Sequence, residues 1–167
     1  MIVMKIIDKI SEWTGAVSAW LVIPLMLVVI NEVVTRHFFN SPTVWGYDVC
    51  WMLFAAQFLL GGAFTMLRDG HIRIDIVYST LSDRAKRIYD LLITLIVILP
   101  PAALLTWAGI EFAADAFASA EKLSTTNWLF PAGVPKTFIP IGFFLLTLQC
   151  VAEILRAIGV LAKGGRA

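Results

Sequence analysis

The sequence predicts an all-α integral membrane protein whose four helices cross the bilayer, with both termini in the cytoplasm. Three observations support this prediction: an apolar composition, four long runs of mostly uncharged residues, and an uneven distribution of lysine and arginine. Of the 167 residues, 59% are hydrophobic and only 15% are charged, whereas soluble domains carry about 25% charged residues. Because so few polar side chains cannot cover an apolar core, lipid must form part of the solvent of this chain.

Four runs are long enough to cross a membrane as helices, since about 20 apolar residues cover the roughly 30 Å of hydrocarbon. The predicted spans cover residues 13–35, 46–67, 88–115 and 137–160. The fourth contains Glu153 and Arg156, which lie one helical turn apart and can form a pair. Strands of a membrane barrel would be about 10 residues long with strict alternation, so these runs favour helices. No linker separates the spans, and residues 1–167 are expected to form one four-helix domain.

Residues 1–12 form an amphipathic stretch before the first span. The apolar run that follows is too long for the core of a secretory signal peptide, and no small-residue cleavage site ends it, so we expect a retained span. Further along the chain, Ser82 is expected to cap a helix that starts at Asp83. Pro100 and Pro101 are expected to kink the third span.

The distribution of basic residues predicts the orientation. Ten of the 13 lysine and arginine residues belong to the termini and the middle loop, which the positive-inside rule places in the cytoplasm. These ten are Lys5, Lys9, Arg68, Arg73, Arg84, Lys86, Arg87, Arg156, Lys163 and Arg166. The other three, Arg36, Lys122 and Lys136, are expected on the outer side of the membrane.

Residues that could carry chemistry do not form a recognisable reactive site. His37 and His71 lie at opposite ends of spans, so one haem cannot use both, and neither has a second ligand at metal-binding spacing. The carboxylates of Glu111 and Asp115, one turn apart at the outer end of span three, have no nucleophile near them in sequence. We interpret them as an acidic surface for a basic partner, and we do not expect an enzyme. A net charge of +1 gives no argument for nucleic acid.

Several polar or small residues inside the spans are typical of helix assembly. Glu32 near the outer end of span one is expected to pair with Arg36. Gln57 and Gln149 lie in mid-span, where a buried amide normally finds a neighbouring helix. Gly61 and Gly62 permit close helix approach. Spacing alone leaves open whether these residues hold this chain together or bind another subunit.

The segment from Asp69 to Asp75 follows span two directly and alternates isoleucine with His71, Arg73 and Asp75. Two interpretations remain open for it. It is either an interfacial connector in contact with anionic membrane lipid, or a structural element that docks on a partner subunit.

Several of these motifs together resemble a known family. The resemblance runs from span one to span four through Glu32, Arg36, Trp45, Asp48, Gly61-Gly62, His71-Ile-Arg-Ile-Asp75, Leu81-Ser82, Pro140-Ile-Gly142 and Gln149. In these motifs the chain is similar to the small, Q-type (DctQ-like) membrane subunit of the tripartite ATP-independent periplasmic (TRAP) transporters.

The resemblance implies a non-catalytic subunit in the bacterial inner membrane. It implies two protein partners: a large multi-span subunit that carries substrate and sodium, and a periplasmic substrate-binding protein that captures an organic acid. No cofactor is expected in this chain itself, since sodium belongs to the large subunit. Candidates for the subunit interface are Gln57, Gly61, Gly62, His71, Arg73, Asp75 and Gln149. Candidates for periplasmic docking are Arg36, Asp48, Glu111, Asp115, Glu121 and Lys122.

Two alternatives remain beside this interpretation. A membrane anchor of a respiratory complex would need ligating histidines within the spans, and a small four-helix exporter would need a central acid in span one. The sequence offers neither feature in a favourable place, since Glu32 lies near the end of its span.

The basic residues generate a first testable prediction. Reporter fusions or cysteine labelling should place Met1, the loop around Arg84, and Ala167 in the cytoplasm, with Ser41 and Thr125 outside, because lysine and arginine resist translocation. Labelling of a cysteine at position 125 from the cytoplasmic side alone would contradict the predicted topology.

Overall fold

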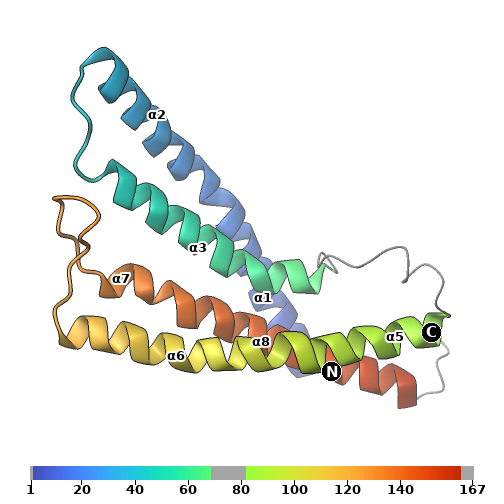
Figure 1. Cartoon of the computed structure of the whole chain (residues 1–167). Helices are drawn as coiled ribbons and strands as arrows, with labels where there is room; N and C mark the ends of the chain where they lie inside the picture. Colours follow the sequence, from blue (N-terminus) through green and yellow to red (C-terminus); the bar gives the residue numbers. More distant parts are fainter. Residues whose placement is uncertain (1, 69–81, 163–167) are drawn as a thin grey trace.

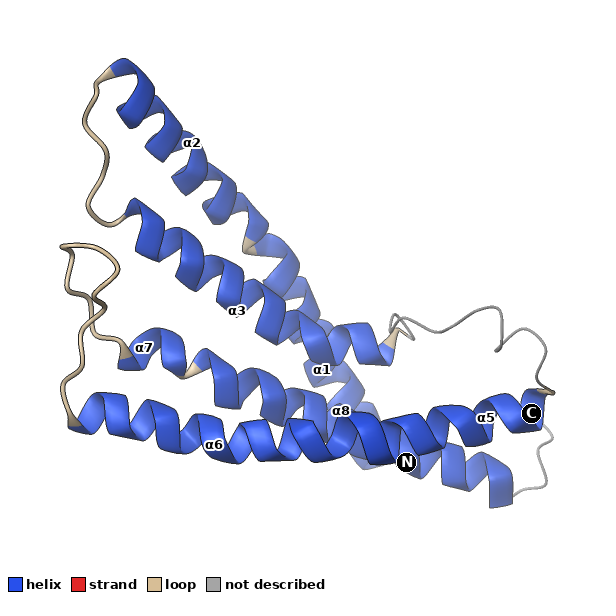
Figure 2. Ribbon diagram, viewed as in Figure 1, coloured by secondary structure: helices blue, strands red, loops and turns tan. Residues whose placement is uncertain are grey.

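The computed structural model describes residues 2–68 and 82–162, and all regular structure within them is helical. The helices, shown in Figures 1 and 2, are α1 (Ile2–Trp20), α2 (Val22–Phe38), α3 (Gly46–Leu67), α5 (Asp83–Leu92), the π-helix η1 (Ile93–Ile98), α6 (Leu99–Ala118), α7 (Gly133–Lys136) and α8 (Phe138–Ala162). The segment that was expected to be interfacial, with His71, Arg73 and Asp75, lies outside the described residues.

Four helical rods are long and apolar enough to cross a membrane, which confirms the predicted all-α, four-span architecture. They are Val3–Phe38, Gly46–Leu67, Ala85–Ala118 and Gly133–Leu161. The first and third are longer than predicted, at 36 and 34 residues. At 1.5 Å per residue each reaches about 50 Å, well beyond the roughly 30 Å of hydrocarbon, so these rods must tilt or extend past it.

Prolines account for the irregular points within these rods. Pro24 lacks an N–H to donate to the carbonyl of Trp20, and α1 gives way to α2 at Leu21. Pro100 and Pro101 deprive two carbonyls of the preceding turn of their donors in the same way. There the helix widens, and the N–H of Leu99 donates to the carbonyl of Thr94 across a π-helical turn. Figure 2 shows the helical rod continuing through η1, so the structure has a local widening of the helix at these prolines.

The rods form two arms that meet at one end and diverge at the other (Figure 1). One arm contains α2 and α3, and the other contains α6 and α8. We call the end where α1 and α5 begin and α8 ends the basal end. The end where α2 and α6 terminate is the distal end. Helix α3 packs against α1, α2 and α8 and so joins the arms, whereas α2 contributes no buried residue.

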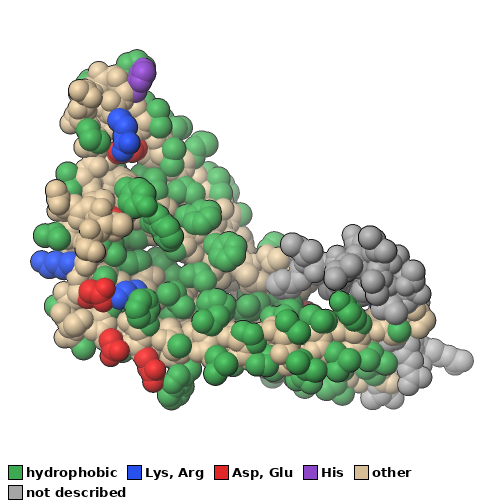
Figure 3. All heavy atoms as spheres, viewed as in Figure 1, with side chains coloured by type: hydrophobic (Ala, Val, Ile, Leu, Met, Phe, Trp, Pro, Cys, Tyr) green, Lys and Arg blue, Asp and Glu red, His purple; other side chains and the backbone are tan. Residues whose placement is uncertain are grey.

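Small residues occupy the helix contacts, while large apolar side chains point outward. The buried apolar residues are almost all alanine or cysteine, including Ala63, Ala113 and Cys150. Figure 3 shows the bulky hydrophobic side chains on the outside of the molecule. At Gly142 an added Cβ would lie 2.7 Å from the backbone oxygen of Leu59. Close backbone approach therefore holds α3 to α8, as is typical of helices that pack in lipid.

The described caps agree with the sequence interpretation. Helix α5 begins at Asp83 behind Ser82, whose hydroxyl oxygen accepts a hydrogen bond of 3.4 Å from the N–H of Ala85. The break between spans one and two lies between Phe38 and Gly46. The hydrogen bond to Ser82 confirms the predicted N-cap of α5.

Candidate functional site

A polar cluster at the basal end joins α1 to α8 and is centred on Gln149, which is completely buried. Its carbonyl oxygen accepts a hydrogen bond of 2.8 Å from the hydroxyl of Ser11. Its amide nitrogen donates to Asp8 at 3.3 Å and to Glu153 at 3.2 Å. The amide is thus satisfied within this chain, and its proposed contact with another subunit stays a prediction.

Arg156 supplies the positive charge of the same cluster. Its guanidinium forms ion pairs with Asp8 on α1 and with Glu153 on its own helix, the latter at 2.6 Å. The expected pairing of Glu153 with Arg156 is therefore confirmed. Two carboxylates converging on one arginine, with an amide between them, form a network that ties the first described turns of the chain to the last.

The sequence interpretation did not identify Asp8 and Ser11 as members of this cluster. A signal for Ser11 exists, because it begins a line of small polar residues on one face of α1. Ser11, Thr14 and Ser18 are all buried. The hydroxyl of Ser18 donates 2.6 Å to the backbone carbonyl of Gln57 in α3. The helix turns this small, polar face inward, because its isoleucine and tryptophan side chains are better solvated by lipid.

At the distal end, Glu32 closes the turn between α2 and α3. One carboxylate oxygen accepts a hydrogen bond of 2.9 Å from Arg36, as predicted. The other accepts from the hydroxyl of Thr43 and, at 3.2 Å, from its backbone N–H. Because the loop residue Thr43 donates twice to it, Glu32 has a structural explanation that needs no proton transfer.

Asp48 anchors the loop between α6 and α7. It lies in the first turn of α3, where the exposed N–H groups of a helix favour negative charge. The side chain is 2% exposed and accepts a hydrogen bond from Thr126, whose hydroxyl oxygen in turn accepts 3.2 Å from the N–H of Trp128. Asp48 was expected on the docking surface, but the structure places its carboxylate inside the chain.

The remaining docking candidates lie on exposed distal positions. Glu111 and Asp115 are exposed on α6, and Glu111 accepts a hydrogen bond of 3.0 Å from Trp107. Glu121 pairs with Lys136 at 2.5 Å, and that ammonium also lies 3.9 Å from the ring centroid of Phe112. Figure 3 shows acidic and basic side chains gathered at this end of the molecule. Arg36 and Lys122 are likewise exposed.

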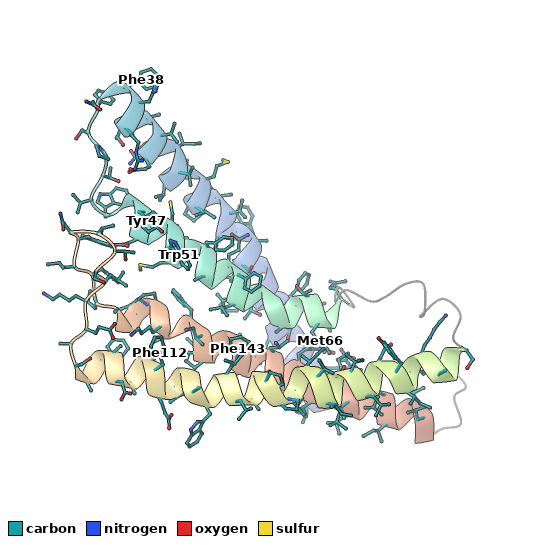
Figure 4. The ribbon with its side chains drawn as sticks, in the orientation of Figure 1. Phe38, Tyr47, Trp51, Met66, Phe112 and Phe143 are labelled. Atoms are coloured by element: carbon teal, nitrogen blue, oxygen red, sulfur yellow. The ribbon has the colours of Figure 1, made fainter. Side chains whose placement is uncertain are left out.

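Groups of three or more histidine, cysteine or carboxylate side chains arranged to hold a metal are absent from residues 2–68 and 82–162. His37 lies at the distal end of α2 and contacts Phe38 edge to face, at 5.1 Å between ring centroids (Figure 4 labels Phe38). Several of the described polar side chains, among them Ser11, Ser18 and Asp48, connect one element of the fold to another.

The basal cluster generates a prediction that compares two variants, one in the cluster and one in an exposed ion pair. Arg156→Gln should lower the stability of the purified chain by about 1–3 kcal/mol, because two partly buried carboxylates lose the positive charge that they share. Arg68→Gln is the control: Arg68 also pairs with an α1 carboxylate, Glu12, at 3.5 Å. That pair is 62% and 55% exposed, against 33% and 28% for Arg156 and Asp8.

The control should change stability by less than about 0.5 kcal/mol. Denaturation in detergent, followed by intrinsic tryptophan fluorescence, measures both variants. Equal losses for the two would show that the cluster adds nothing beyond a surface ion pair.

Comparison with known proteins places this fold in a family. A family model described as tripartite ATP-independent periplasmic transporters, DctQ component, matches residues 25–159. The chain is 26% identical over 94 residues to the sialic acid TRAP transporter permease protein SiaT of Haemophilus influenzae (strain 86-028NP). It is 24% identical over 88 residues to the C4-dicarboxylate TRAP transporter small permease protein DctQ of Vibrio cholerae serotype O1.

These alignments cover 56% and 50% of this chain, but only 15% of SiaT and 38% of the Vibrio protein. The family model, by contrast, includes most of this chain, from α2 into α8. Four apolar rods, polar groups used for assembly and a match of this extent lead to one conclusion: the chain belongs to the DctQ family, the small permease component of TRAP transporters.

Proposed function

We propose that this chain is a non-catalytic subunit of a sodium-coupled TRAP transporter that takes up an organic acid across the bacterial inner membrane. It scaffolds the large transport subunit and helps to dock the periplasmic substrate-binding protein. The match to the DctQ component over residues 25–159 is the observation that supports this most strongly. The two relatives are named for a sialic acid and a C4-dicarboxylate, which are both organic acids.

The comparison with SiaT supports a large partner. Only 15% of that permease aligns with this chain, so the similar segment there is joined to a much longer polypeptide. The Vibrio relative carries the similar segment in a protein called a small permease. A segment that occurs both as part of a larger permease and in a small one is expected to assemble with the larger part.

One face of α3 fits this partner best. Tyr47, Trp51, Phe54 and Phe58 follow one another along it at helical spacing, and Phe58 is 74% exposed. Trp51 donates a hydrogen bond of 3.1 Å to Tyr47, and Figure 4 labels both residues on α3. On the same face, Gly62 has open space where a Cβ would lie. A glycine with open space at its Cβ, beside aromatic side chains, lets another helix approach closely.

The exposed distal carboxylates supply the proposed docking surface. Glu111 and Asp115 face solvent on α6, with Glu121 and Lys122 nearby in the following loop. Opposite charges on a periplasmic protein would steer its approach to them. The basal end would then face the cytoplasm, with both termini, in keeping with the distribution of lysine and arginine.

Reconstitution tests this function directly. In proteoliposomes with a sodium gradient, the chain alone should give no uptake of sialic acid or C4-dicarboxylates, since coupled transport needs ionisable or backbone ion sites in mid-membrane. Uptake should require the large subunit and the binding protein encoded with it. Sodium-dependent uptake by this chain alone would refute a scaffolding role.

The α3 face gives a second prediction. Gly62→Leu should leave the melting temperature of the isolated chain unchanged, because the added side chain meets open space. Co-purification with the large subunit should fall about tenfold or more, as expected when close helix packing is blocked. Gly142→Leu should instead unfold the chain itself, by overlap with Leu59.

Gly159 provides the control for Gly62, since it also has open space at its Cβ but lies near the end of α8. Gly159→Leu should leave the complex intact. If Gly62→Leu and Gly159→Leu weaken it equally, the interface does not lie on this face of α3.

A further inference from the structure

A cavity of about 370 Å³ lies at the basal end, between the ends of three helical rods. Met66 at the end of α3 forms one wall (Figure 4 labels it), Ile93 and Ile98 of η1 form another, and Ile154 and Val160 of α8 form the third. Since a water molecule occupies about 30 Å³, the cavity has room for roughly a dozen groups of that size. This is space for a lipid head group or for part of an acyl chain.

On α5 and η1 the cavity lining changes from charged to apolar along the helical rod. Arg87 and Asp90 line the part of the cavity nearest the basal end, whereas Thr94 and Ile98 line it farther along. Arg87 and Ile98 are 11 residues apart, which on a continuous helix is about 16 Å. Along α5 and η1 this is the order of polarity of a phospholipid, from head group to acyl chain, whereas α8 contributes both charged residues (Glu153, Arg156) and apolar ones (Ile154, Val160).

Among the described side chains around the cavity, Arg87 has no charged partner. Arg156 is paired with Asp8 and Glu153. Asp90 also has an interaction partner within the chain. Arg87 is partly buried, and none of the side chains that the structure describes pairs with its guanidinium. A partly desolvated guanidinium with five N–H donors requires an acceptor, and an anion from outside the chain is the best one available.

We propose that this cavity binds the phosphodiester of a membrane phospholipid, with the phosphate on Arg87 and an acyl chain along the wall of Ile93, Ile98 and Ile154. A guanidinium matches phosphate oxygens in a two-pronged arrangement. Basic pockets between membrane helices are recurrent head-group sites. The apolar wall favours a lipid over a soluble anion, because only a lipid brings hydrocarbon to cover it. This proposal does not depend on the transport function.

Native mass spectrometry of the full-length chain, purified in mild detergent with any subunit that accompanies it, measures the bound phospholipid. Arg87→Gln should weaken binding about tenfold, as for the loss of a hydrogen bond to a charged group. Ala157→Phe fills the cavity from a residue that lines it and leaves every charge in place, so it should also displace the lipid. The control, Lys9→Gln, removes an exposed positive charge on α1. This variant should keep the bound phospholipid.

Retention of phospholipid by both Arg87→Gln and Ala157→Phe at the wild-type level would overturn the proposal. If Arg87→Gln does not fold, Ala157→Phe decides alone, because it removes space rather than charge. Added inorganic phosphate distinguishes the source of the anion. Displacement of the lipid by equimolar inorganic phosphate would show a free-phosphate site instead, whereas a glycolipid without phosphate should fail to replace the phospholipid.

Discussion

Close approach of α3 to its neighbours is the constraint on which the rest of this structure depends. At Gly142, α8 comes so near to α3 that an added carbon would meet the backbone of Leu59. At Gly15 of α1, the same added carbon would meet the ring of Phe64. Lipid solvates large apolar side chains as well as protein does, so burying them gains little. The helices therefore join through alanine and glycine, and the bulky residues remain outside.

This arrangement, with small residues inside and bulky apolar residues outside, determines where polar groups form contacts. Where helices touch through small residues, hydroxyls and amides come within reach of neighbouring helices, as Ser11 does with Gln149 and Ser18 with the backbone of Gln57. In hydrocarbon such groups have no competing water, so each must be paired inside the protein. Close packing of the helices thus brings the groups of the basal cluster together, and their hydrogen bonds in turn hold α1 against α8. At the distal end, where the arms diverge, loops provide the connections through Thr43 and Thr126.

How much of this could be predicted from the sequence depends on the distance along the chain between partners. The spans were predictable because hydropathy is a local property, and the pairs Glu32–Arg36 and Glu153–Arg156 because helical spacing alone brings them together. The contact of Asp48 with Thr126 crosses 78 residues, and no pattern indicated it. Asp48 therefore appeared to be a surface charge. The inward face of α1 was also missed, because lipid reverses the rule that the apolar face is the buried one.

The basal cluster has a consequence for how the chain is made. Ser11 and Asp8 find their partners 138 and 148 positions later, on the last helix of the described chain. At about 5–20 residues per second, synthesis reaches those partners only roughly 7–30 s after Ser11 and Asp8 have been added to the chain. During that interval the Asp8 carboxylate and the Ser11 hydroxyl lack their hydrogen-bond partners on α8. Helix α1 thus enters the membrane early but reaches its final packing only when α8 has been made and its side chains can pair with Asp8 and Ser11.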